Sequence, residues 1–256
     1  MMKQRFKEFT LIELLMVIAI LGILLSLLLP SLSAAREKAK FAVCKSNQKQ
    51  IAIGYISYVN SNDGFYPAVF EHSSYIGWDD VLSPYMGLNY TQEQIDTNRI
   101  TDPNFESLVL ACPSDDVPRG NNGFKRSYNA SEYSSNRKHI FNGLMGFRFP
   151  GESHESINMA MVSDPANVVV SGETWAGWNR QGTGYDNHTK LILPYYDLLR
   201  THSNTIIEGF FLGHDGKGPA NFSMVDGHVK GMNGKRIFDG QKNPGTNLCE
   251  GTMIDH

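Results

Sequence analysis

The chain has 256 residues, of which 41% are hydrophobic and 19% charged, a balance typical of folded proteins and not of disordered ones. Its formal net charge of −3 argues against a general nucleic-acid binder, because such proteins are normally clearly basic. No nucleic acid is therefore expected among its partners.

The first predicted element is a nearly unbroken apolar run over residues 11–29, in which Glu13 is the only charged side chain. A helix of about 19 residues rises about 28 Å, close to the hydrocarbon thickness of a bilayer. Basic residues flank the run on both sides, with Lys3, Arg5 and Lys7 before it and Arg36, Lys38 and Lys40 after it. Because the first cluster directly precedes the run, we expect a single-pass helix in the inner (cytoplasmic) membrane, with a cytoplasmic N-terminus and a periplasmic or extracellular head.

A cleavable export signal is the main alternative for this run. In the segment Ser31-Leu32-Ser33 before Ala34, the two serines are small residues of the kind that a signal peptidase prefers. However, the apolar stretch is longer than a typical signal core and contains a carboxylate. We therefore expect a retained membrane helix.

The segment over residues 7–15 reads KEFTLIELL and resembles the class III signal of type IV prepilins and type II secretion pseudopilins. The resemblance implies that a prepilin peptidase cuts between Glu8 and Phe9 and then methylates the new amine of Phe9. The family usually has glycine or another small residue before the cut, where this chain has Glu8. Residues 1–8 would then be a leader peptide.

The same resemblance gives Glu13 a role in assembly. An ionised carboxylate within lipid costs roughly 2–4 kcal/mol unless it finds a partner. The cationic amine of Phe9 in one subunit would pair with Glu13 of a neighbour, and this pairing would fix the axial register. The alternative is that Glu13 lies at interfacial depth, where headgroups solvate it. The implied partners are the prepilin peptidase, identical or related pilin-like subunits in a filament, and membrane lipid.

Beyond the apolar run, the helix is expected to continue as an amphipathic stalk. Pro30 falls where the long helix of pilins commonly bends, because a proline inside a helix removes a hydrogen bond and kinks it. The side chains expected to face a sheet recur at three- and four-residue spacing, namely Phe41, Cys44, Gln48, Ile51 or Ala52, Tyr55 and Val59. Turn-forming residues at 60–64 end the pattern, so one helix is predicted from Leu14 to about Tyr58.

The expected organisation has four segments: a leader over 1–8, a transmembrane and assembly helix over 9–30, its amphipathic continuation over 31–60, and a globular head over 61–256. In the head, strands are predicted at 108–111, 168–171, 210–212, 221–225 and 228–232, with long loops between most of them. Asp226-Gly227 predicts a two-residue hairpin turn. The expected fold class is α+β and pilin-like, with one long N-terminal helix packed on a small antiparallel sheet.

A second resemblance links the head to pilin-like proteins of planctomycete-type and lentisphaera-type bacteria. It rests on Cys44, the CPSD segment at 112–115, the segment at 165–173 and a terminal element from His214 to the Asp-Gly at 226–227.

The candidate sites in the head are few. Cys44 and Cys112 could form a disulfide that pins the stalk to the head, and two separate buried thiols are the alternative. His214, Asp215, Asp226 and His228 are weak candidates for binding calcium or another divalent ion. A turn flanked by histidines explains them more simply, so no cofactor is expected.

The sequence contains no nucleophile elbow, phosphate-binding loop or paired-cysteine metal motif, so no catalytic residue and no enzyme activity are expected. We expect a filament-forming structural subunit, either a pseudopilin of a type II secretion-like machine or a minor pilin of a type IV pilus-like system. One alternative is a secreted binding protein or enzyme with a cleaved export signal. The other is a membrane-anchored surface protein that does not polymerise.

Overall fold

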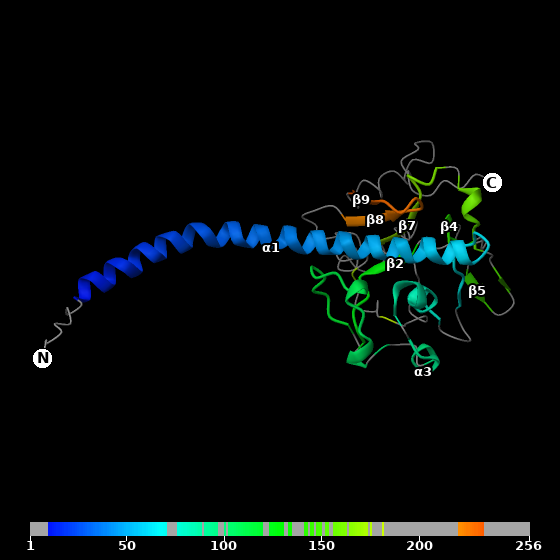
Figure 1. Cartoon of the computed structure of the whole chain (residues 1–256), viewed down its shortest axis with the longest axis horizontal. Helices are drawn as coiled ribbons and strands as arrows, with labels where there is room; N and C mark the ends of the chain where they lie inside the picture. Colours follow the sequence, from blue (N-terminus) through cyan, green and yellow to red (C-terminus); the bar gives the residue numbers. More distant parts are fainter. Residues whose placement is uncertain are drawn as a thin grey trace, which may run out of the picture. The chain divides into compact units, whose positions relative to one another are not determined.

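The computed structural model describes residues 10–70, 76–88, 90–96, 100, 102–119, 123–130, 133–134, 141–142, 144–145, 147–149, 152–153, 156–162, 164–173, 175, 181 and 220–232. The chain forms two compact units, residues 1–40 and residues 41–256 (Figure 1). The second unit contains the helical residues 41–61 together with the head.

Helix α1 runs from Leu11 to Ser61 and continues through Pro30 as an α-helix. In the first unit, every side chain from Thr10 to Ala39 is exposed. The helix is long and apolar enough to cross a membrane, and none of its most apolar stretch is buried within the protein. A signal sequence near an N-terminus would share these properties.

In the second unit, residues 41–61 of α1 bury one face against the head. The buried side chains are Cys44, Asn47, Gln48, Ile51, Ala52, Gly54, Tyr55 and Val59. The predicted amphipathic stripe is therefore confirmed from Cys44 to Val59, whereas Phe41 is only half-buried. Asn47 and Gly54 were not predicted, because neither fits an apolar pattern.

The helix ends at Ser61, slightly beyond the predicted end. Asp63 and Gly64 follow with positive φ angles of 51° and 83°. The backbone N–H of Gly64 donates to the carbonyl of Val59 at 3.0 Å, a closure typical of helix C-termini that end in a left-handed residue. The turn-forming residues after the helix therefore end it as predicted.

The head is built around a four-stranded antiparallel sheet in the order β2-β7-β8-β9. Its strands are β2 (Tyr128–Ala130), β7 (Val169–Glu173), β8 (Ala220–Met224) and β9 (Val229–Met232). Every residue of β2, β7 and β8 is buried. Gln48 on α1 donates to Ser171 on β7 at 2.9 Å, so the helix lies against this sheet (Figure 1). The expected α+β class is confirmed.

Short elements complete the described part of the head. A second sheet joins β1 (Val69–Phe70), β5 (Phe147–Phe149) and β6 (Glu152–Ser153), and β3 (Tyr133–Ser134) pairs with β4 (Phe141–Asn142). The short helices are α2 (Trp78–Leu82), α3 (Gln92–Asp96) and the 3₁₀ turns η1 (Ser83–Met86), η2 (Pro103–Phe105), η3 (Leu108–Leu110) and η5 (Met159–Met161).

Three of the five predicted strands are present in the structure. Those at 168–171, 221–225 and 228–232 correspond to β7, β8 and β9 and are confirmed, whereas 210–212 lies outside the described residues. The strand predicted at 108–111 is wrong, because this segment forms η3. The side-chain amide of Asn47 donates to the carbonyls of Leu108 and Ala111, each at 3.1 Å. A tight turn presents both carbonyls to the helix, which an extended strand would not.

The predicted two-residue turn in the last hairpin is also corrected. The backbone N–H of Met224 donates to the carbonyl of His228 at 2.9 Å, and that of Gly227 donates to the carbonyl of Met224 at 2.8 Å. These bonds close a loop of three residues, Val225, Asp226 and Gly227. Gly227 has φ of 83°, the left-handed residue expected after a type I turn in such loops.

Candidate assembly segment and its anchor in the head

Glu13 lies in the first turn of α1, where it makes a reciprocal cap with Thr10. One carboxylate oxygen of Glu13 accepts from the backbone N–H of Thr10 at 2.9 Å and from its hydroxyl at 2.8 Å. The backbone N–H of Glu13 donates to the Thr10 hydroxyl oxygen at 3.3 Å. This arrangement is a capping box, and it places the carboxylate at the end of the helix where the dipole favours negative charge. Thr10 was missed as a functional residue, although Thr-x-x-Glu before an apolar run signals it.

Two serine hydroxyls in this part of the helix are satisfied within the helix itself. The hydroxyl of Ser26 donates to the carbonyl of Ile23 at 2.7 Å, and that of Ser31 donates to the carbonyl of Leu28 at 2.8 Å. Such bonds remove the need for an external partner when the helix lies in an apolar environment. Glu13 is the only charged side chain among residues 9–35.

Several predicted site residues lie outside the described residues, namely Glu8, Phe9, His214 and Asp215. Asp226 and His228 lie together at the β8-β9 turn, where an Asp226 oxygen accepts from the His228 backbone N–H at 3.0 Å and lies 2.7 Å from the imidazole Nδ1. Slight burial raises the pKa of the Asp226 carboxyl, but the two contacts with His228 outweigh it and leave this pKa below its ordinary value. These contacts explain both side chains as parts of the turn.

The turn of this hairpin contacts α1 at Lys49 and Ile56. Lys49 donates through Nζ to the carbonyl of Gly227 at 2.5 Å. A Cβ atom added to Gly227 would lie 2.7 Å from Cδ1 of Ile56. Glycine is favoured here by its positive φ, and any larger residue would also have to displace the end of the Ile56 side chain.

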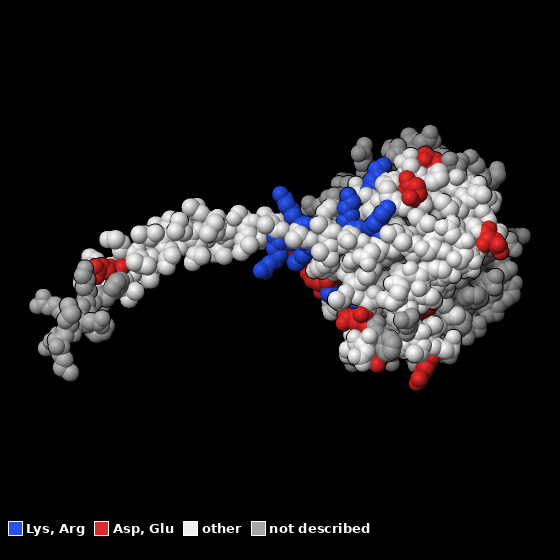
Figure 2. All heavy atoms as spheres, in the orientation of Figure 1, with Lys and Arg blue, Asp and Glu red and all other residues white. Residues whose placement is uncertain are grey.

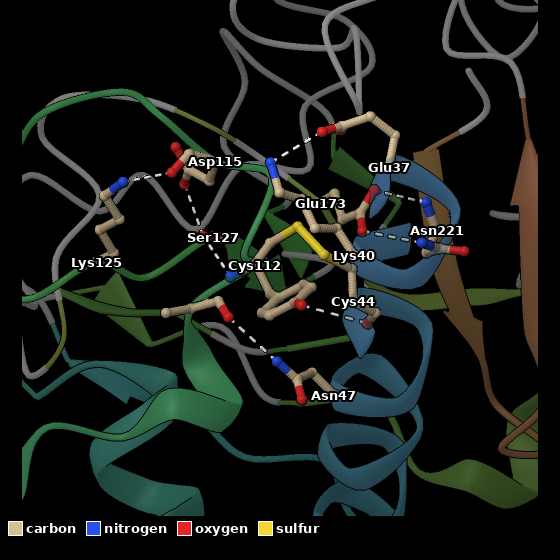
Figure 3. The surroundings of a disulfide bond; sticks show 12 residues. Glu37, Lys40, Cys44, Asn47, Cys112, Asp115, Lys125, Ser127, Glu173 and Asn221 are labelled. Carbon is tan, nitrogen blue, oxygen red and sulfur yellow. Dashed lines mark hydrogen bonds and ion pairs between the residues drawn. A yellow bond between two sulfur atoms is a disulfide. The ribbon is translucent and has the colours of Figure 1, made fainter. Parts of the chain in front are cut away.

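Cys44 on α1 and Cys112 after η3 form a disulfide, and both cysteines are buried (Figure 3). The bond closes a loop with a sequence separation of 68 residues. A cross-link of that span stabilises a fold by about 4 kcal/mol in the entropic model, because it restricts the unfolded chain. A carboxylate oxygen of Glu173 lies within 4.8 Å of both sulfur atoms, yet sulfurs bonded to each other are not thiolate ligands for a metal.

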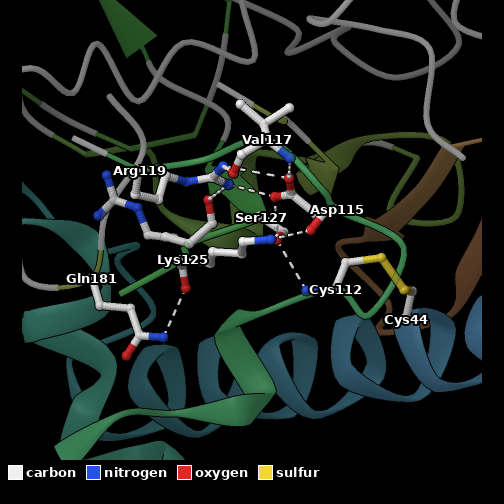
Figure 4. A network of polar contacts seen from close by, with 9 residues as sticks. Cys44, Cys112, Asp115, Val117, Arg119, Lys125, Ser127 and Gln181 are labelled. Atoms are coloured by element: carbon white, nitrogen blue, oxygen red, sulfur yellow. Dashed lines mark hydrogen bonds and ion pairs between the residues drawn. A yellow bond between two sulfur atoms is a disulfide. The ribbon is translucent and has the colours of Figure 1, made fainter. Parts of the chain in front are cut away.

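The loop after Cys112 is held by a buried carboxylate, Asp115 (Figure 4). Asp115 accepts from the hydroxyl of Ser127 at 2.6 Å, and it forms a buried ion pair with Arg119. The hydroxyl oxygen of Ser127 also accepts from the backbone N–H of Cys112 at 2.9 Å. Ser127 thus links two residues of the CPSD segment, because its hydroxyl donates to Asp115 and accepts from Cys112, and this holds the disulfide in place.

A second buried ion pair links Asp79 on α2 to Arg126, and both side chains are fully buried. The Arg126 guanidinium lies 5.7 Å from the ring centroid of Trp78, and that ring stacks on Tyr55 of α1 at 5.8 Å. The ion pair therefore belongs to the packing between the helix and the head. Burial raises the pKa of the neighbouring Asp80 carboxyl well above its usual value, and the charge of Asp79 adds to this rise.

The described residues thus place the predicted features in two groups. The first is the exposed apolar stretch of α1 with its capped Glu13, and the second is the set of contacts that anchors residues 44–59 in the head. Comparisons with protein-family models, with curated proteins and with solved structures find no significant match to this chain.

Proposed function

We propose that this chain is a pilin-like filament subunit, a pseudopilin or minor pilin, that inserts into a membrane and assembles through the first part of α1. The observation that carries the proposal is the long exposed apolar surface of this helix. Large apolar side chains from Leu11 to Leu32 are exposed, including Leu11 at 82% and Leu27 at 70%. Soluble monomers rarely expose an apolar patch of this size, so lipid or other helices must cover it.

Both environments suit the same helix at different stages. Lipid covers the apolar side chains before assembly, and the helices of neighbouring subunits cover them in the filament. Backbone groups are satisfied within an α-helix, and Ser26 and Ser31 satisfy their hydroxyls internally. The disulfide and the Lys49 contact tie the following part of the helix to the head, which would then be carried on the filament surface.

Glu13 supplies the register in this proposal. It is the only charged side chain from residue 9 to residue 35, so a cationic partner has a single position at which to pair. The capping box with Thr10 satisfies the carboxylate before a neighbour arrives. The amine of Phe9 from an adjacent subunit then neutralises the charge within the membrane, as the prepilin-like motif implies.

The N-terminus of the mature protein tests the proposal. We expect mass spectrometry of the chain from its native membrane to find a start at Phe9, with a methylated amine. A start near Ala34 would contradict the proposal, because the apolar helix would be lost, and a secreted binding protein or enzyme would be favoured. An intact Met1 would contradict processing by a prepilin peptidase and favour a membrane-anchored protein that does not polymerise.

A further inference from the structure

Three basic side chains follow the apolar stretch of α1 within the first unit, and we call them the basic collar: Arg36, Lys38 and Lys40. Arg36 and Lys38 are exposed, and the Lys40 side chain is 35% exposed. Lys40 pairs with Glu37 at 3.0 Å, so the collar and Glu37 together carry a net charge of +2, three cations minus one anion. Figure 2 shows Lys and Arg side chains gathered on the helix directly beyond its uncharged length.

The collar places cations on two opposite sides of the helix instead of on one side only. Successive residues of an α-helix turn by about 100°, so Arg36 and Lys40 lie about 40° apart around the axis. Lys38 lies on nearly the opposite side, about 200° from Arg36. A neighbouring protein contacts one side of a helix, whereas a layer of lipid headgroups surrounds it. The distribution of charge therefore fits a headgroup layer better than a protein surface.

The position of the collar along the helix also agrees with binding to lipid headgroups. If the hydrocarbon layer begins at Leu11, about 30 Å of helix brings it to about Ser31. The headgroup layer extends roughly 5–7 Å further, and Arg36 lies about 7–8 Å beyond Ser31. Side chains of a helix tilt toward its N-terminus, and long basic side chains extend along apolar surfaces to reach polar groups. We therefore expect Arg36 to reach the lipid phosphates most easily, with Lys38 and Lys40 extending back toward them from about 10 and 13 Å beyond Ser31.

We propose that the basic collar binds the headgroups of anionic phospholipids in the leaflet farther from the N-terminus, and so fixes the depth of α1. This inference rests on the membrane insertion in the proposed function, but not on processing or on filament assembly. Anionic lipid in that leaflet would hold the subunit at one height, with Glu13 at a constant depth for a neighbour to meet.

The test measures lipid selectivity of the full-length chain in nanodiscs of phosphatidylcholine and phosphatidylglycerol at about nine to one. The background chain carries K3Q, R5Q and K7Q, which removes the cations before the helix. Native mass spectrometry counts the lipids retained by the protein. Each basic residue near an anionic surface contributes about fivefold, so adding R36Q, K38Q and K40Q should lower the enrichment of phosphatidylglycerol at least tenfold. High salt should lower it in the background chain as well, through screening.

Lys230, an exposed cation of β9, provides the control. The variant K230Q should leave the enrichment unchanged. Unchanged enrichment in the collar variant would overturn the inference, and so would an equal fall with K230Q, since net charge alone would then explain it. If the collar instead pairs with acidic groups of neighbouring subunits, lipid selectivity will persist and filament yield will fall. Failure of the chain to enter nanodiscs would contradict membrane insertion itself, which separates the two proposals.

Discussion

Replacing Glu13 with glutamine should leave α1 folded and inserted but reduce filament assembly by roughly two orders of magnitude. Glutamine at this position preserves a capping box with Thr10, so the start of the helix is retained. It removes the negative charge, however, and leaves the amine of Phe9 unpaired in lipid. That loss costs about 2.5–3.5 kcal/mol, which corresponds to a factor of about a hundred. The measurement is the amount of chain in sheared filaments relative to its amount in the membrane.

Thr10→Ala is the matched control, because it removes the capping hydroxyl and keeps the charge of Glu13. Loss of the cap should cost about 0.5–2 kcal/mol, so assembly should fall less than in Glu13→Gln. The reverse order, with Thr10→Ala impaired and Glu13→Gln active, would show that Glu13 serves only to cap the helix. Pairing between subunits through this carboxylate would then be wrong.

Replacing Arg126 with leucine should destabilise the head by about 3–5 kcal/mol. The change breaks the buried ion pair with Asp79, and removing one partner of a buried ion pair is strongly destabilising. It also removes the guanidinium from the face of Trp78, which packs against Tyr55 of α1. Denaturant unfolding of the full-length chain in detergent, followed by tryptophan fluorescence, measures the loss of free energy of unfolding.

The double variant Asp79→Leu/Arg126→Leu separates charge from packing. Replacing both partners of a buried ion pair with apolar residues is often nearly neutral, so the double variant should recover most of the stability. A double variant as unstable as Arg126→Leu would mean that lost packing, and not the buried charge, causes the effect. A single variant within about 1 kcal/mol of the wild type would contradict the buried pair altogether.

Elements with strong periodicity could be predicted from the sequence. The spacing from Cys44 to Val59 located the buried face of α1, and the Asp-Gly pair at 226–227 located the β8-β9 hairpin. The number of residues in the β8-β9 loop could not be predicted from the sequence. Loops of two and of three residues share similar sequences, and a glycine with positive φ such as Gly227 occurs in both kinds of loop.

Contacts between distant segments could not be predicted. The segment at 108–111 has the composition of a strand, but Asn47 binds its carbonyls from 61 and 64 residues away. Asp79 and Arg126 are separated by 47 residues, and no local signal pairs them. Cysteine content allowed either a disulfide or two thiols, and the fold joins Cys44 to Cys112.

Most of the candidate assembly site could be predicted from the sequence motif alone. The motif singled out Glu13 as a charge in an apolar helix, whereas the structure adds Thr10 as its partner within the same chain. A carboxylate satisfied in this way can enter lipid at lower cost than an isolated one. This explains how a monomer could hold Glu13 in the membrane before it meets a neighbour.

The most direct test of assembly is to shear surface or periplasmic fibres from native cells, pellet them and identify their proteins by mass spectrometry. We expect the chain in the fibre pellet, beginning at methylated Phe9. A chain that is processed at Phe9 but occurs only as a monomer in the membrane fraction would contradict its role as a filament subunit.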